Sequence, residues 1–138
     1  MKEYFNNLGF EINGILHLTG KQAYTCLQSG AILVDVREDF EIAIKDFGMT
    51  GKLWCPFSEF EKLYKTLPHE KPLIVADCVS TNSKDATRKL LENGYSRVAN
   101  LAGGIADWER DGLPMSKDIE SMNGQCPCMI KSRSANGN

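Results

Sequence analysis

The stretch from Lys71 to Gly94 constrains the fold of this chain more than any other. It begins with a continuous apolar run, Leu73 to Ala76, which is typical of a strand buried on both faces of a parallel sheet. Small polar residues follow from Asp77 to Asn82, and a helix is predicted from Ser83, with Gly94 placed to end it. This order of strand, short loop and helix directs the backbone N–H groups at the helix N-terminus towards one point.

Cys78 lies in that loop, and its position supports two interpretations. The helix dipole and the unpaired amides would stabilise a thiolate there, which would lower the pKa of the thiol and make Cys78 a nucleophile at neutral pH. Alternatively, Cys78 is a small apolar residue at the end of a core strand, because unpaired cysteines are among the most buried residues. This stretch alone leaves both interpretations open.

Short apolar runs alternate with amphipathic segments along the rest of the chain. Strands are expected at residues 31–36, 52–55 and 97–101, and helices at residues 19–27 and 40–44, after Ser58 and from Gly103-Gly104 to Asp111. Thr19 can cap the first helix, Ser58 with Glu61 matches a capping box, and residues 47–51 are expected to form a loop. Asn13-Gly14, between short apolar pairs, predicts a β-hairpin at residues 10–18. The alternation favours a mostly parallel sheet with right-handed crossovers.

Asp35 and Arg37 follow the expected strand at residues 31–36, at its carboxyl end. Open parallel sheets place their ligand crevices at this edge, so both side chains are candidates for binding a substrate. They could also simply pair with each other and fix the turn that follows.

Composition narrows the function classes. The chain has 138 residues, enough for one domain with a real core, and its net charge is −2 without a basic stripe, so nothing points to nucleic acid. No apolar run approaches membrane-spanning length, and residues 1–10 lack the apolar core of a secretory signal. The five cysteines are odd in number and irregularly spaced, which argues against a disulfide scaffold and favours a reducing cytoplasm.

Five motifs in order resemble those of a single-domain rhodanese. They are Leu-Val-Asp-Val-Arg-Glu (33–38), Pro-Phe-Ser-Glu-Phe (56–60), Lys-Pro-Leu-Ile-Val (71–75), Asn-Leu-Ala-Gly-Gly-Ile-Ala-Asp-Trp (100–108) and Gly-Leu-Pro (112–114). The resemblance implies an α/β fold, with a central, mostly parallel sheet and helices on both faces. Residues 1–115, hairpin included, would form this domain. Residues 116–138, which lack apolar periodicity, are predicted to be a flexible tail that carries cysteines.

The resemblance also implies a chemistry. Enzymes of this family use a cysteine in the loop after the strand that corresponds to residues 71–76. Its thiolate takes a sulfane sulfur from thiosulfate or a related donor, holds it as a persulfide and passes it to an acceptor thiol. Cys78 would be the catalytic residue here, and the residues expected to bind substrate are Asp77, Val79, Ser80, Thr81, Asn82, Ser83, Asp35 and Arg37. The expected partners are a small sulfur donor and an acceptor thiol, including that of a protein, with no metal, cofactor, nucleic acid or membrane. The oligomeric state is not indicated.

The loop departs from the family pattern. It contains neither glycine nor arginine, and an ungapped alignment of both flanks puts Asp77 at the customary cysteine position. Residues 45–51 lack the usual histidine. Either Cys78 takes the role of the nucleophile from a shifted position, or the domain is a non-catalytic binding module with a degraded loop. A phosphatase is the weaker interpretation, because Arg88 lies a full turn into the predicted helix.

Cys126 and Cys128 flank a proline in the tail. Two thiolates could supply half of a zinc site, but no nearby histidine completes the four ligands. A sulfur relay with Cys78 is the sharper hypothesis, because tail thiols could exchange with it. The alternative is two incidental cysteines. His17 and His69 are expected to be surface or turn residues.

Overall fold

A six-stranded sheet forms the centre of the molecule. The computed structural model describes residue 5 and residues 7–116. In spatial order the strands are β1 (Phe10–Ile12), β2 (Ile15–Leu18), β7 (Val98–Leu101), β6 (Leu73–Ala76), β3 (Ile32–Asp35) and β5 (Leu53–Trp54). The β1–β2 pair is antiparallel, whereas the four other pairs are parallel. The predicted mostly parallel sheet is confirmed.

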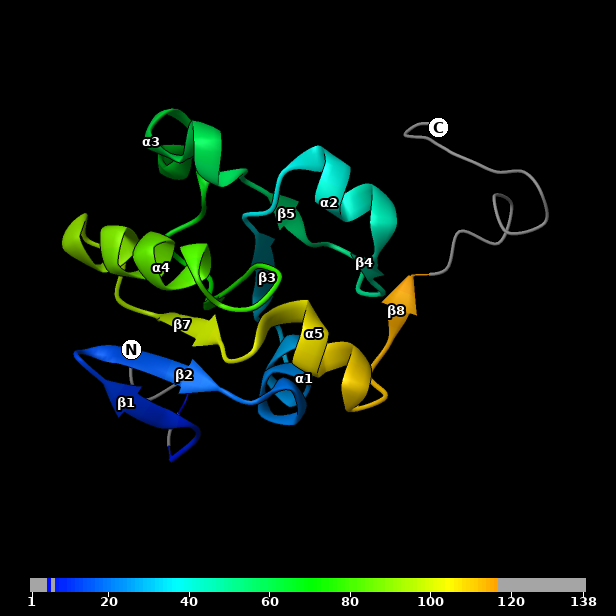
Figure 1. Cartoon of the computed structure of the whole chain (residues 1–138). Helices are drawn as coiled ribbons and strands as arrows, with labels where there is room; N and C mark the ends of the chain where they lie inside the picture. The colour runs from blue at the N-terminus through cyan, green and yellow to red at the C-terminus, as the bar shows by residue number, and fades with distance from the viewer. Residues whose placement is uncertain (1–4, 6, 117–138) are drawn as a thin grey trace.

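Helices cover both faces of this sheet (Figure 1). They are α1 (Gly20–Gln28), α2 (Asp39–Ile44), α3 (Phe60–Leu63), α4 (Asn82–Glu92) and α5 (Gly104–Arg110), with 3₁₀ turns η1 (Phe57–Glu59) and η2 (Tyr64–Thr66) on either side of α3. A separate antiparallel pair, β4 (Asp46–Phe47) with β8 (Met115–Ser116), ties the segment after α2 to the end of the described chain.

Alternating side chains of the central strand enter two apolar cores. Leu73 and Val75 of β6 pack with residues of α3 and α4 on one face. Ile74 and Ala76 point to the other face, where α1 and α5 supply Cys26 and Trp108 among other residues. All four β6 residues are fully buried, because a parallel strand covered by helices on both faces has no solvated side. The α/β class is confirmed.

The N-terminal signals of the sequence act as predicted. Asn13 and Gly14 both have positive φ values, 52° and 81°, as a type I′ turn requires between β1 and β2. Thr19 caps α1: its side chain accepts from the amide of Gln22, and the Gln22 side chain accepts from the Thr19 amide. The hairpin and the first helix are therefore specified locally.

One local prediction is wrong and another holds only in part. Ser58 does not form a capping box with Glu61: its amide and hydroxyl both donate to the carboxylate of Glu38, and the chain forms η1 there. Residues 48–51 form the loop expected at residues 47–51, but Phe47 belongs to β4, whose partner β8 lies far along the sequence. In both cases a partner distant in sequence decides the local structure. The predicted boundary between domain and tail lies at the end of the described residues, so it stays a prediction.

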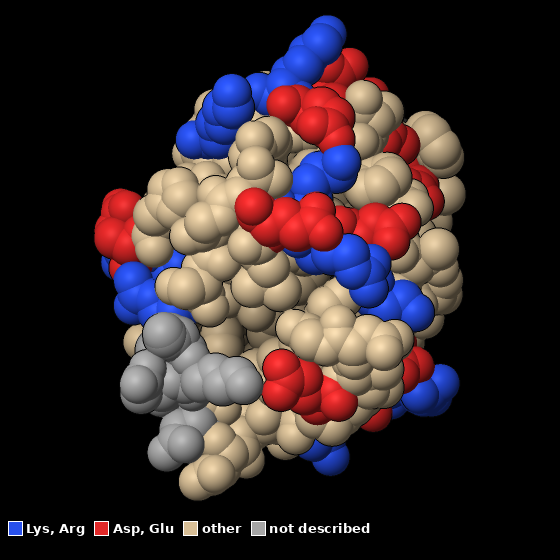
Figure 2. Space-filling model, turned by 90° about the vertical axis from the view of Figure 1, so that its left-hand side faces the viewer, with Lys and Arg blue, Asp and Glu red and all other residues tan. Residues whose placement is uncertain are grey.

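Positive and negative side chains alternate on the face shown in Figure 2, without a large field of one sign. Among residues 5 and 7–116, none of the helices combines the length and apolarity needed to cross a bilayer.

Candidate active site

The carboxyl ends of three neighbouring parallel strands converge on one site. Asp77 and Cys78 directly follow β6, Arg37 lies two residues after the end of β3, and Asn100 lies in β7. Because parallel strands all end at the same edge of the sheet, the fold brings these residues together as the sequence predicted for Asp35, Arg37 and the loop.

The carboxylate of Asp77 occupies the centre of the loop. It accepts hydrogen bonds from the amides of Ser80, Asn82 (2.7 Å) and Ser83 (3.1 Å), and the Ser83 hydroxyl lies 3.4 Å from it. Asp77 is only 6% exposed, so these charge-assisted bonds replace most of its hydration. The amides at the start of α4 thus converge on an anion, but on the chain's own carboxylate rather than on the sulfur of Cys78.

A buried polar network fixes this loop from behind. Ser80 has a φ of 76°, a conformation that costs a non-glycine residue free energy. Its hydroxyl accepts from Asn100 Nδ2 (2.7 Å), whose carbonyl accepts from the Ser83 hydroxyl (2.5 Å). Asn100 Nδ2 also lies 3.0 Å from Nδ1 of His17 on β2. The network holds Ser80 in its left-handed conformation, which directs the Ser80 amide towards Asp77.

Cys78 is half-buried and points towards α2 rather than into the core. Its thiol donates to Oε2 of Glu41 at 3.3 Å. Burial raises the pKa of Cys78, and the hydrogen bond and charge of Glu41 and the charge of Asp77 raise it further, while the positive charge of Arg37 opposes them. The resting side chain is therefore a neutral thiol, in contrast to the lowered pKa that the loop amides alone predict.

Arg37 is fully engaged by the protein. Its Nε and Nη2 donate to the two carboxylate oxygens of Asp35 (3.0 and 2.8 Å), and its Nη1 donates to the backbone carbonyls of Lys45 (2.8 Å) and Glu41 (3.4 Å). Nη2 also lies 3.5 Å from the carboxylate of Asp46. Both Asp35 and Arg37 are buried, so they pair and fix the turn after β3, while the guanidinium charge still acts on Cys78.

The remaining loop residues face outward. Val79, Thr81 and Asn82 are exposed. The amides of Val79 and Thr81 donate no hydrogen bond to any residue in the described part of the chain. Of the amides expected to bind substrate, these two are available to a ligand, whereas those of Ser80, Asn82 and Ser83 are used by Asp77.

Three residues of the site were not predicted. Glu41 carries no local signal beyond its place in the helix after β3. Asn100 stands inside an apolar strand, and such a buried amide must find partners, which was a usable signal. The expectation that His17 is a surface or turn residue is wrong: it is 6% exposed, and burial lowers its pKa, with a smaller contribution from Lys84.

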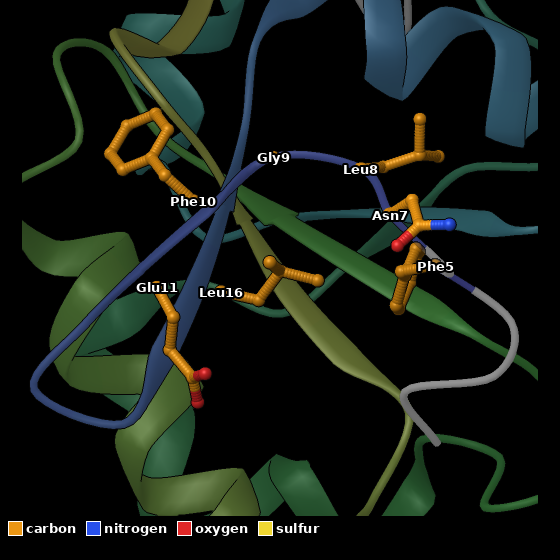
Figure 3. A pocket seen from close by; sticks show the side chains of 7 residues that line it. All are labelled: Phe5, Asn7, Leu8, Gly9, Phe10, Glu11 and Leu16. Carbon is orange, nitrogen blue, oxygen red and sulfur yellow. The ribbon is translucent and has the colours of Figure 1, made fainter.

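Other candidate sites lie elsewhere or outside the described residues. No group of three potential metal ligands occurs among residues 5 and 7–116, and Cys126 and Cys128 lie beyond them. A hollow of about 310 Å³ is formed between the segment before β1 and the β1–β2 hairpin, and Figure 3 shows the side chains that line it. It contains none of the residues of the Asp77–Cys78 site.

Comparisons with known proteins agree with this geometry. The family model described as "Rhodanese-like domain" matches residues 19–111, which is most of the described fold. The chain belongs to the rhodanese family. It is 32% identical over 102 residues to the thiosulfate sulfurtransferase GlpE of Haemophilus influenzae, an alignment that covers 71% of this chain and 91% of the relative. The GlpE of Actinobacillus pleuropneumoniae serotype 7 is 29% identical over 99 residues, covering 68% and 86%.

Solved structures show the same fold. A rhodanese-related protein from Thermoplasma volcanium superposes with a TM-score of 0.65 at 25% identity, covering 72% of this chain and 96% of that one. A polysulfide-sulfur transferase homodimer from Wolinella succinogenes gives the same TM-score at 24% identity, covering 90% and 85%. The rhodanese-like fold is thus confirmed, and the loop around Asp77 and Cys78 is the part of the rhodanese site that departs from expectation.

Proposed function

We propose that this chain is a sulfurtransferase that passes a sulfane sulfur through a persulfide on Cys78 to an acceptor thiol. Membership of the rhodanese family and the similarity to thiosulfate sulfurtransferases support the reaction class. The observation that carries the proposal is the position of the half-buried Cys78 thiol after the end of β6. The thiol donates to Glu41, and the positive charge of Arg37 acts on it.

The reaction begins with loss of the thiol proton to water, against the stabilisation of the thiol by Glu41. The Cys78 thiolate then attacks the outer sulfur of thiosulfate. A new sulfur–sulfur bond forms on Cys78, the bond within the donor breaks, and sulfite leaves with its electron pair. The free amides of Val79 and Thr81 are placed to bind the anionic donor or the persulfide.

In the second half, an acceptor thiolate attacks the terminal sulfur of the persulfide. The bond to Cys78 Sγ breaks, and Cys78 leaves as the thiolate, which Glu41 again stabilises as a thiol once a proton returns. No net oxidation occurs and no metal or cofactor takes part. The small donor and the acceptor thiol are the proposed partners, and a reducing cytoplasm, where thiols persist, is the proposed compartment.

One observation favours a second function. The Asp77 carboxylate fills the position where the loop amides converge, so a side chain of the protein itself already occupies the place of a bound anion. A non-catalytic rhodanese-like binding module needs no persulfide, and a loop stabilised in this way would serve it.

Intact mass spectrometry after incubation with thiosulfate separates the two functions. The wild-type chain should gain the mass of one sulfur atom, and peptide mapping at the earliest reaction times should place it on Cys78. The matched variants are Cys78→Ser, which should gain none, and Cys126→Ser/Cys128→Ser, which should still be modified on Cys78. If Cys78 remains unmodified in both wild type and tail variant, while a sulfur donor other than thiosulfate also fails, the binding module is the function.

A further inference from the structure

The described chain ends beside the candidate active site. Ser116 of β8 pairs with Asp46 of β4, the strand that follows α2 (Figure 1). The Asp46 carboxylate lies 3.5 Å from Nη2 of Arg37, and the charge of Arg37 acts on Cys78. The next 22 residues, 117–138, therefore follow a strand whose partner, β4, contacts Arg37 of the site.

Three exposed apolar side chains lie on the two segments that carry and contact the thiol, the loop after β6 and α2. Phe40 and Ile44, one turn apart on α2, are 67% and 78% exposed, and Val79, next to Cys78, is 62% exposed. We call these three residues the apolar rim. Helix α2 buries none of its own residues, yet Glu41, between Phe40 and Ile44, accepts the hydrogen bond of the Cys78 thiol. A helix with two large apolar side chains in water next to a reactive group is typical of a docking face.

The C-terminal segment matches this surface in sequence. Cys126 and Cys128 are followed by Met129-Ile130, so apolar side chains stand directly next to two thiols. From Ser121 to the end, the segment contains Lys131 and Arg133 and no acidic residue. The first turn of α2 supplies the complementary charges Asp39 and Glu41.

The length of the connection also fits. Cys126 lies ten positions after Ser116, a span of about 33 Å for an extended chain and of about 17 Å on average for a flexible coil of that length. A tethered group within such a distance has an effective concentration on the order of millimolar. The segment would therefore compete well with free thiols for Cys78.

We propose that residues 122–131 of the chain's own C-terminal segment dock on the apolar rim, and that Cys126 or Cys128 accepts the sulfane sulfur from Cys78. The transfer step rests on the proposed sulfurtransferase function, whereas the docking does not. In this step a tail thiolate bonds to the terminal sulfur of the Cys78 persulfide, the bond to Cys78 Sγ breaks, and Cys78 leaves as the thiolate. One sulfur–sulfur bond forms and one breaks, so the step needs no oxidant or reductant.

Docking is tested first by alkylation of Cys78 in the full chain, in a Cys126→Ser/Cys128→Ser background that leaves Cys78 as the accessible thiol of the described fold. Phe40→Ser/Ile44→Ser in the rim and Met129→Ser/Ile130→Ser in the tail should each increase the alkylation rate at least threefold. Combining them should give no further increase, because both remove one contact. Ile12→Ser, which changes a 51% exposed residue on the distant edge strand β1, should change nothing.

Independent, multiplicative effects of the rim and tail variants, or no effect of either, would overturn the docking.

Transfer is tested second, by loading the wild-type chain with thiosulfate and mapping the added sulfur with time. The sulfur should pass from Cys78 to a tail cysteine at a rate independent of protein concentration, and about tenfold more slowly in Met129→Ser/Ile130→Ser. A rate that rises with protein concentration assigns the tail to a second copy and refutes docking within one chain.

The two proposals fail in different ways. Sulfur that stays on Cys78 refutes the relay and leaves the sulfurtransferase function intact. Absence of sulfur on any cysteine, combined with the non-additive alkylation result, refutes the sulfurtransferase function and leaves the docking intact.

Discussion

In the usual rhodanese pattern one cysteine would both carry the thiol and receive the loop amides. Here Cys78 carries the thiol, and Asp77 receives the amides. The backbone places residue 77 where three amides of the loop converge, and residue 78 one position further, against α2. The carboxylate at position 77 already accepts the hydrogen bonds of these amides, so the amides stabilise the folded loop rather than a reaction intermediate. The thiol at position 78 receives no such stabilisation and stays neutral.

We expect Asp77→Ala to destabilise the fold by about 2 kcal/mol, because it leaves the amides of Ser80, Asn82 and Ser83 without their acceptor. Urea unfolding measures this loss. The same variant should increase the alkylation rate of Cys78 at neutral pH, since a negative charge that raises the pKa of the thiol is gone. Asp85→Ala is the control: its side chain is exposed on α4 and its removal should cost less than about 0.5 kcal/mol. Equal losses in both variants would contradict the role of Asp77.

Glu41→Gln should increase the reactivity of Cys78 more than Asp77→Ala does. The hydrogen bond and the charge of Glu41 each raise the pKa of the thiol more than the charge of Asp77 does. Glutamine retains an oxygen that can accept from the Glu38 amide, so the start of α2 stays capped. The pH dependence of iodoacetamide alkylation should shift to lower pH, whereas Asp39→Asn on the exposed side of α2 should leave it in place. An unshifted profile would mean that Glu41 does not control the thiol.

At this scale the sequence singled out Asp77 and Cys78 but not the contact that controls the thiol. Counting residues from both flanks placed Asp77 at the customary cysteine position, and the structure gives Asp77 the loop amides. The pairing of Asp35 with Arg37 was one of two stated alternatives, and it is observed. Glu41 could not be found, because its contact with Cys78 depends on how α2 packs. The pKa of a thiol depends on such neighbours, and the lowering that the loop amides alone would give Cys78 is not observed.

The contact between the loop and α5 determines how the elements of the site fit together. The amides of Ile105 and Ala106 donate to the backbone carbonyls of Asp77 and Cys78 (2.9 and 3.2 Å). Gly104, with a φ of 60°, lies against those same carbonyls, and a Cβ atom there would overlap them. The glycine allows the start of α5 to satisfy the loop carbonyls while α4 supplies the amides.

Gly104→Ala should therefore displace the loop and destabilise the protein by about 2 kcal/mol or more, since the overlap is with backbone atoms that cannot rotate away. Gly112→Ala is a matched control, because Gly112 also has a positive φ (76°) but no atom lies within 4 Å of its added Cβ. Thermal unfolding of the two variants separates the overlap from the cost of the φ angle alone. If both variants have the same melting temperature, the close approach of Gly104 to the loop carbonyls does not contribute to stability.

Elements whose signals are local were predicted, and those decided by distant partners were not. The hairpin turn at Asn13-Gly14 and the cap at Thr19 need only neighbouring residues, and both are confirmed. The pairing of β4 with β8 joins Asp46 to Ser116, and each strand has only two residues, too few for a periodic pattern. Ser58 does not form the expected capping box because its hydroxyl donates to Glu38, which the fold brings close from the segment after β3.

In the described part of the chain, residues 5 and 7–116, the guanidinium near Cys78 is not free to bind an anionic donor. The guanidinium of Arg37 is engaged by Asp35, Asp46 and backbone carbonyls, and the nearby groups Glu41 and Asp77 are negative. The rhodanese fold is retained, but the field at its loop is less favourable to thiosulfate than a loop with arginine would be.

Turnover in a thiosulfate:cyanide assay should accordingly be about a hundredfold below that of the Haemophilus influenzae GlpE protein, the loss expected when one oriented donor of an anion site is missing. The rate should rise with pH above neutrality. Because the pKa of Cys78 is raised, the thiolate fraction grows about tenfold per pH unit until the pH reaches that pKa. Glu41→Gln should move this rise to lower pH, and Cys78→Ser should abolish turnover. A rate equal to that of GlpE and flat between pH 7 and 9 would show that the thiolate is stabilised in the donor complex by groups other than those that surround it at rest.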